Sequence, residues 1–132
     1  MECKTMNRIC TLGGNITTWR DEFEELINLR TACSISYVHL PNYKLPATEY
    51  LQWFISKISH CDVAILNLDY LDEITKFEIA IINTINAISD KYVFIVGYGE
   101  EINLPQYIKE ALFHISYSIE DVADYIATNL II

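Results

Sequence analysis

The sequence predicts a single α/β domain in which helices cover both faces of a five-stranded parallel sheet. Short apolar runs alternate with segments of helical periodicity along the whole chain, which is the pattern of successive β-α-β units. A chain of 132 residues is long enough for one buried core and too short for two, so we expect residues 1–132 to form one domain. We expect right-handed crossovers and the strand order 2-1-3-4-5.

The first half of the chain carries two predicted strands, each followed by a helix. Residues 7–13 form a short apolar strand that ends in a Gly-Gly pair, and a threonine then caps a helix that runs to about Arg30. Residues 34–39 form the second strand. A loop bounded by two prolines follows, and Pro46 suits the first turn of a helix over residues 47–59.

The second half repeats the alternation around a central strand, Val63–Leu66, whose continuous apolar run is typical of a buried parallel strand. The helix expected over residues 75–89 is apolar on nearly all sides. The remaining elements are a strand over 92–97, a short helix over 105–113, a short strand over 114–118 and a last helix capped by Ser118. This order of elements indicates a flavodoxin-like or Rossmann-like three-layer sandwich.

The overall charge and hydropathy exclude several classes of partner. A net charge of −9 disfavours a nucleic acid polymer, because binding a phosphate backbone requires clustered lysine and arginine. No apolar run approaches the roughly 20 residues of a membrane span, and no signal peptide precedes the first strand, so we expect a cytoplasmic protein without a membrane partner. Hydrophobic residues make up 52% of the chain, which favours burial of part of the surface between subunits.

The cysteines and histidines do not follow metal-ligand spacings. The four cysteines are scattered without a Cys-x-x-Cys pair, so we expect neither a disulfide framework nor a zinc site. The three histidines share no ligand spacing either. We therefore expect no metal ion and no cofactor.

Acidic and amide side chains follow the central strand directly. Asn67, Asp69 and Asp72 lie after the strand, and Glu78 lies near the start of the following helix. In open α/β sheets, ligands bind at the carboxyl ends of the strands. One strand–loop–helix unit is therefore expected to deliver three carboxylates and an amide to one crevice.

This region resembles a known family. The segment CDVAILNLDYLDEITKFEI resembles the central motif of nucleoside 2-deoxyribosyltransferases and of their relatives, the deoxynucleoside 5'-monophosphate N-glycosidases. The family pattern is an apolar strand ending in Asn-Leu-Asp, then Asp-x-Gly-Thr-x-x-Glu at a helix start. Asn67 and Asp69 match the first part, and Asp72, Thr75 and Glu78 match the second at the same spacing. Ile74 stands where the family has glycine.

Two further segments extend the resemblance over nearly the whole chain. The segment LGGNITTWRDEF resembles the first loop of the family and its Trp-Arg helix start, with Gly14 where proline is usual. The segment SIEDVADYI resembles the closing helix of small phage and bacterial members. Ile74 remains a departure, because glycine permits dihedral angles and close substrate approach that a β-branched residue does not.

The resemblance implies a role for each matching residue. Glu78 matches the carboxylate nucleophile that attacks the anomeric carbon, and Asp72 would bind sugar hydroxyls or help to protonate the leaving base. The other expected substrate contacts are Gly13, Gly14, Asn15, Trp19, Arg20, Asn67, Asp69 and Thr75. Structural interpretations stand beside these: a helix-end carboxylate for Glu78, a helix cap for Thr75 and a core position for Trp19.

The resemblance thus predicts an enzyme that cleaves or transfers at the N-glycosidic bond of a nucleoside or nucleotide, as a transferase or a hydrolase. The alternative is a module that binds a nucleotide or a nucleotide-derived signal without turning it over. A phospho-receiver-like regulator is disfavoured, because Leu-Gly-Gly and not acidic residues end the first strand.

The apolar helix predicts self-association. One of its faces must meet the sheet, and the apolar residues of the opposite face would promote association if left in water. We expect a homodimer or a higher even oligomer, with Ile81, Ile82 or Ile85 in the interface. Assembly of this kind, with the partner subunit near the site, is also what the family resemblance implies.

Overall fold

A computed structural model of the chain describes residues 8–12, 18–39, 46–100 and 103–131. Its sheet has five strands in the order β2-β1-β3-β4-β5, and every neighbouring pair is parallel. The strands are β1 (Arg8–Thr11), β2 (Ser36–His39), β3 (Val63–Asn67), β4 (Phe94–Tyr98) and β5 (His114–Ser116). The predicted α/β class and the strand order are therefore confirmed.

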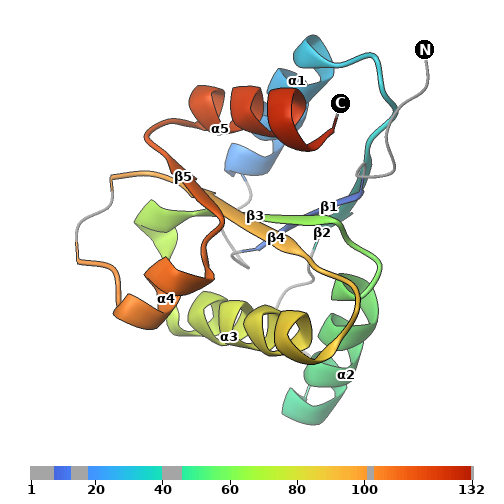
Figure 1. The fold of residues 1–132 in the computed structure, drawn as a ribbon, viewed down its shortest axis with the longest axis vertical. Helices are drawn as coiled ribbons and strands as arrows, with labels where there is room; N and C mark the ends of the chain where they lie inside the picture. The colour runs from blue at the N-terminus through green and yellow to red at the C-terminus, as the bar shows by residue number, and fades with distance from the viewer. Residues whose placement is uncertain (1–7, 13–17, 40–45, 101–102, 132) are drawn as a thin grey trace.

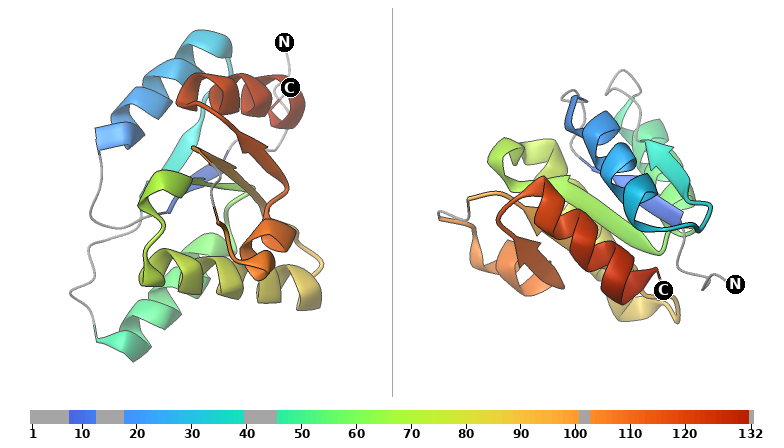
Figure 2. Two further views of the ribbon diagram at one scale, coloured as in Figure 1. Left: turned by 90° about the vertical axis from the view of Figure 1, so that its left-hand side faces the viewer. Right: turned by 90° about the horizontal axis from the view of Figure 1, so that it is seen from above.

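Helices cover both faces of this sheet, which gives three layers (Figures 1 and 2). One face carries α1 (Thr18–Arg30) and α5 (Ile119–Tyr125), which continues into the π-helical segment η2 (Ile126–Leu130). The other face carries α2 (Ala47–Ile58), α3 (Glu73–Ile88) and α4 (Gln106–Ala111). The side of each helix follows from right-handed crossovers, since the chain steps back from β1 to β2 but forward at the later connections.

Each helical layer has its own hydrophobic core. All five residues of β3 are buried, as expected for a strand covered on both faces. Phe54 of α2, and Ile79 and Ile82 of α3, pack on one face of the sheet, and Phe23 and Ile27 of α1 pack on the other. The expectation that Ile82 lies in a subunit interface is wrong, because this side chain is 0% exposed and belongs to the core.

The start of α3 differs from the sequence prediction by two residues. The helix begins at Glu73, and its N-cap is Asp72, whose carboxylate accepts a hydrogen bond from the Thr75 amide. The helix cap assigned to Thr75 is therefore wrong: a short aspartate side chain one position before the helix satisfies the free amides of the first turn. At α5 the predicted Ser118 cap is confirmed, with a bond from the Asp121 amide of 3.1 Å.

The cysteines also depart from expectation. Cys33 is disulfide-bonded, whereas Cys10 and Cys61 are free and buried. The sequence led us to expect no disulfide framework, and the bond at Cys33 departs from that expectation, since the spacing of cysteines along a chain does not reveal which of them the fold brings together. Among the helices of the described residues, none has the length and hydropathy needed to cross a membrane.

Candidate functional site

The strand order has a topological switch point between β1 and β3, at the carboxyl edge of the sheet. These two strands are neighbours, but the chain leaves β1 toward α1 on one face and leaves β3 toward α3 on the other. In open α/β sheets, ligands bind at such a switch point, outside the carboxyl ends of the strands. The acidic segment predicted from the sequence follows β3 and therefore lies next to this switch point.

Glu78 lies in the second turn of α3 and is completely buried, with 0% of its surface exposed. Tyr50, in the first turn of α2, donates a hydrogen bond from its hydroxyl to Glu78 Oε2 at 2.5 Å. A carboxylate held by a phenol in the absence of bulk water is strongly oriented, because such charge-assisted bonds are short and directional. The hydroxyl of Tyr50 therefore fixes the orientation of the Glu78 carboxylate.

The buried Cys10 thiol of β1 has a raised pKa. A hydrogen bond with the Cys61 thiol and burial raise the pKa of the Cys10 thiol well above its usual range. The Glu78 carboxylate raises that pKa further, and the Arg20 guanidinium lowers it. Glu78 and Arg20 belong to α3 and α1, which pack on opposite faces of the sheet.

Asp72 and Thr75 form a compact cap at the start of α3. Asp72 Oδ1 accepts from the Thr75 amide at 2.8 Å and from the Thr75 hydroxyl at 2.7 Å. Thr75 is buried and Asp72 is exposed, so the cap presents a carboxylate at the helix N-terminus. Ile74 is the second residue of α3 and packs against the core next to it. Its helical backbone needs no positive φ, so a β-branched residue fits at this position.

Asn67 and Asp69 organise the turn that joins β3 to α3. Asn67 Oδ1 accepts from the Asp69 amide at 2.9 Å, and Asp69 Oδ1 accepts from the Glu100 amide at 3.2 Å, which ties the ends of β3 and β4 together. Gly99 has φ of +139°, and a Cβ there would lie 3.0 Å from Asp69 Oδ1. This close approach requires glycine. The two polar residues therefore fix the conformation of the chain at the carboxyl ends of β3 and β4.

The predicted residues on the β1 side are only partly described. Trp19 is a core residue, 6% exposed, in edge contact with Tyr98 at a ring-centroid distance of 5.8 Å. Arg20 is 5% exposed at the start of α1. Gly13, Gly14 and Asn15 lie outside the described residues.

Tyr50 is the contact that the sequence analysis missed. It lies 28 residues before its partner Glu78, on a helix assigned only to packing. One signal was present: Tyr50 precedes Phe54 by four residues, which places its hydroxyl on the buried face of α2, where a polar group needs a partner.

Two further observations bear on ligands. A pocket of about 190 Å³ opens on the same edge of the sheet, at the ends of β4 and β5, and is lined by Gly99, Ile115, Ser116 and Tyr117. In the part of the chain that the structure describes, no three His, Cys, Asp or Glu side chains are grouped as metal ligands would be.

No protein-family model and no curated protein matches the chain. Among solved structures, the lysine decarboxylase LdcF of Francisella novicida is similar, with a TM-score of 0.49 and 10% sequence identity. The similarity covers 95% of this chain but only 17% of that much longer chain.

Proposed function

We propose that this protein cleaves or transfers at the N-glycosidic bond of a nucleoside or nucleotide, with Glu78 as the carboxylate nucleophile. The observation that carries the proposal is the hydrogen bond from Tyr50 to Glu78, which orients a buried carboxylate beside the topological switch point. A nucleophilic carboxylate must be held in one position and kept from water, because both increase its reactivity toward a bound sugar.

The proposed reaction proceeds in two displacements. One oxygen of Glu78 attacks the anomeric carbon, the bond from that carbon to the base nitrogen breaks, and its electron pair leaves with the base. The base takes up a proton as it departs. Water or a second base then attacks the same carbon and releases Glu78 as a carboxylate. Water as the second nucleophile gives a hydrolase, and a base gives a transferase.

The other site residues have supporting roles in this proposal. Asp72 Oδ1 accepts both hydrogen bonds of the helix cap, and in this proposal Asp72 Oδ2 accepts from a sugar hydroxyl or assists proton transfer to the leaving base. The guanidinium of Arg20, at the start of α1, provides positive charge for an anionic group of the substrate. Asn67 and Asp69 hold the turn that positions α3.

A second candidate, a binding module without turnover, is favoured by one specific observation. Glu78 has no exposed surface, so a sugar reaches this carboxylate only after the groups that cover it have moved. In a binding module the Tyr50–Glu78 pair would only stabilise the α2–α3 contact, and the ligand would remain intact in the crevice.

Release of free base from a panel of deoxynucleosides and their monophosphates tests the proposal, with binding followed separately by calorimetry. We expect the Glu78→Gln variant to bind the substrate but to lose several orders of magnitude in turnover, because the amide is not a nucleophile. The matched control is Glu73→Gln, a carboxylate on the same helix whose side chain is 91% exposed, which should retain full activity. Full activity of Glu78→Gln would refute the nucleophile role, and binding without base release by the unmodified protein would favour the binding module.

A further inference from the structure

A serine and a histidine of β5 form a hydrogen-bonded pair outside the site described above. His114 and Ser116 are two residues apart on this strand, so their side chains lie on the same face of the sheet. A hydrogen bond of 3.0 Å joins His114 Nε2 and Ser116 Oγ. At this distance an imidazole is able to take the proton of a serine hydroxyl as the oxygen attacks a substrate.

The His114 ring is held in place by α5. It stacks on the ring of Tyr125 with a centroid distance of 3.6 Å and an interplanar angle of 3°. Burial lowers the pKa of His114 below its ordinary value of 6.5, so the imidazole is neutral near neutral pH and one of its nitrogens accepts a proton. A serine next to a base that is oriented by a third side chain is the arrangement of an activated nucleophile.

Ser116 also lines a small pocket at the ends of β4 and β5. This pocket has a volume of about 190 Å³, and its other lining residues are Gly99, Ile115 and Tyr117. Ser116 is only 7% exposed, so bulk water has little access to its hydroxyl. Pockets for drug-sized ligands have volumes of roughly 300–1,000 Å³, so this pocket is of a size for a short acyl group and not for a whole nucleotide.

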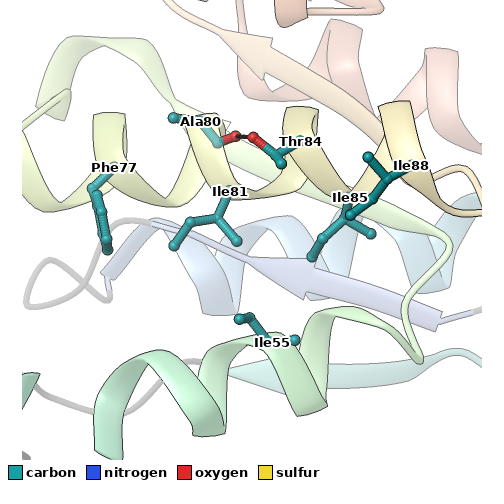
Figure 3. Close-up of a pocket in the computed structure, with 7 residues that line it drawn as sticks. All are labelled: Ile55, Phe77, Ala80, Ile81, Thr84, Ile85 and Ile88. Atoms are coloured by element: carbon teal, nitrogen blue, oxygen red, sulfur yellow. Dashed lines mark hydrogen bonds between the residues drawn. The ribbon is translucent and has the colours of Figure 1, made fainter. Parts of the chain in front are cut away.

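A larger groove of about 470 Å³ between α2 and α3 has a different chemical character (Figure 3). Ile55 borders it from α2, and Ile88 borders it at the end of α3. Its lining is apolar except for the hydroxyl of Thr84, which donates to the Ala80 carbonyl at 2.9 Å. None of the residues that line this groove is a base, so it lacks the pairing of hydroxyl and imidazole that the smaller pocket has.

We propose that Ser116 is the nucleophile and His114 the general base of an esterase site for esters of short carboxylic acids. His114 Nε2 takes the hydroxyl proton while Ser116 Oγ bonds to the carbonyl carbon of the ester. The bond from that carbon to the alkoxy oxygen breaks, and the alcohol leaves with the proton from His114. Water, deprotonated by His114 in the same way, then attacks the acyl-serine, releases the acid and restores the serine hydroxyl. The inference does not depend on the reaction proposed for Glu78.

The composition of the pair restricts the substrate to esters. Within the described part of the chain, the His114 ring is hydrogen-bonded to Ser116 and to no carboxylate. A carboxylate that stabilises the imidazolium contributes strongly to catalysis in serine proteases, so a pair without it is a weaker system. Such a pair suits an ester, because an alcohol leaves the acyl carbon more readily than the amine of a peptide does.

A covalent probe and a chromogenic ester test the nucleophile. We expect diethyl p-nitrophenyl phosphate to attach one diethylphosphoryl group to the peptide that contains Ser116, as detected by mass spectrometry, and the protein to hydrolyse p-nitrophenyl acetate. Ser116→Ala should lose the label and lower hydrolysis by about 100-fold or more. Ser56→Ala, which removes an exposed hydroxyl on α2, is the matched control and should retain both. An unmodified protein without label at Ser116, or undiminished hydrolysis by Ser116→Ala, would overturn the proposal.

Chemical rescue distinguishes a base from a merely structural histidine. We expect His114→Ala to lower hydrolysis of p-nitrophenyl acetate by about 100-fold or more, and added imidazole to restore part of it, because the free base fills the vacated position and takes the serine proton. His60→Ala, at an exposed position, should retain full hydrolysis with no response to imidazole. Failure of imidazole to restore a folded His114→Ala variant would refute the base role. If this variant is insoluble, labelling of Ser116 decides the proposal.

Discussion

Removal of the Tyr50 hydroxyl should lower the stability of the fold by an amount that the structure allows us to estimate. The hydroxyl donates to Glu78 Oε2 at 2.5 Å, and both residues are buried, with exposed fractions of 7% and 0%. A hydrogen bond to a charged group contributes about 1.5–3 kcal/mol. Phenylalanine retains the ring and its stacked contact with Phe54, at a centroid distance of 6.2 Å, so the Tyr50→Phe change isolates the hydroxyl.

Urea denaturation measures this effect directly. We expect Tyr50→Phe to lower the free energy of unfolding by about 1.5–3 kcal/mol with an unchanged m-value. This is a large fraction of the roughly 5–15 kcal/mol that stabilises a typical domain. The control is Tyr107→Phe, which removes the hydroxyl of a tyrosine that is 49% exposed on α4 and should change stability by less than about 0.5 kcal/mol.

A double-mutant cycle separates the contact from other effects of each change. Tyr50→Phe and Glu78→Gln should be non-additive, because the first removes the donor and the second removes the charge of the acceptor in the same hydrogen bond. Two results would show that the hydroxyl does not hold the carboxylate and that the site geometry is wrong. One is a free energy of unfolding for Tyr50→Phe within about 0.5 kcal/mol of that of the unmodified protein. The other is strict additivity of the two changes in free energy.

Two further predictions concern the cap of α3 and the response to pH. Asp72→Ala should destabilise the protein by about 0.5–2 kcal/mol, whereas Asp72→Asn should preserve most of the stability because asparagine is an equally good cap; urea midpoints compare them, and equal losses would contradict the capping role. Burial lowers the pKa of His114, which stacks on Tyr125, below its ordinary value of 6.5. The unfolded chain therefore binds this proton first, so stability is retained above pH 6.5 and falls as the pH drops from there toward the lowered pKa. His114→Gln should flatten this pH dependence relative to the exposed-site variant His60→Gln, and an unchanged profile would refute the assignment.

Much of the fold was predictable because the relevant information is local. The continuous apolar run of β3 specifies a strand covered on both faces, and the serine–aspartate pair at Ser118 specifies a helix start. Alternation of strands and helices, together with the handedness of crossovers, then leaves few topologies. The same locality explains why Asn67, Asp69, Asp72 and Thr75 were assigned to one strand–loop–helix unit. In the structure they form two short-range hydrogen-bonded pairs, Asn67 with Asp69 and Asp72 with Thr75.

The contacts of Glu78 and the orientation of α3 were decided by tertiary structure. The Tyr50–Glu78 bond joins two helices separated by a full strand, and no local pattern encodes the distance between them. In α3 the apolar residues surround the helix, so the sequence carries no phase that tells which of them meets the sheet. Only packing resolves this: Ile82 is buried in the core, while Ile88 remains 82% exposed at the groove. A periodic pattern determines that a helix forms, but the direction of its faces is set by the surfaces against which it packs.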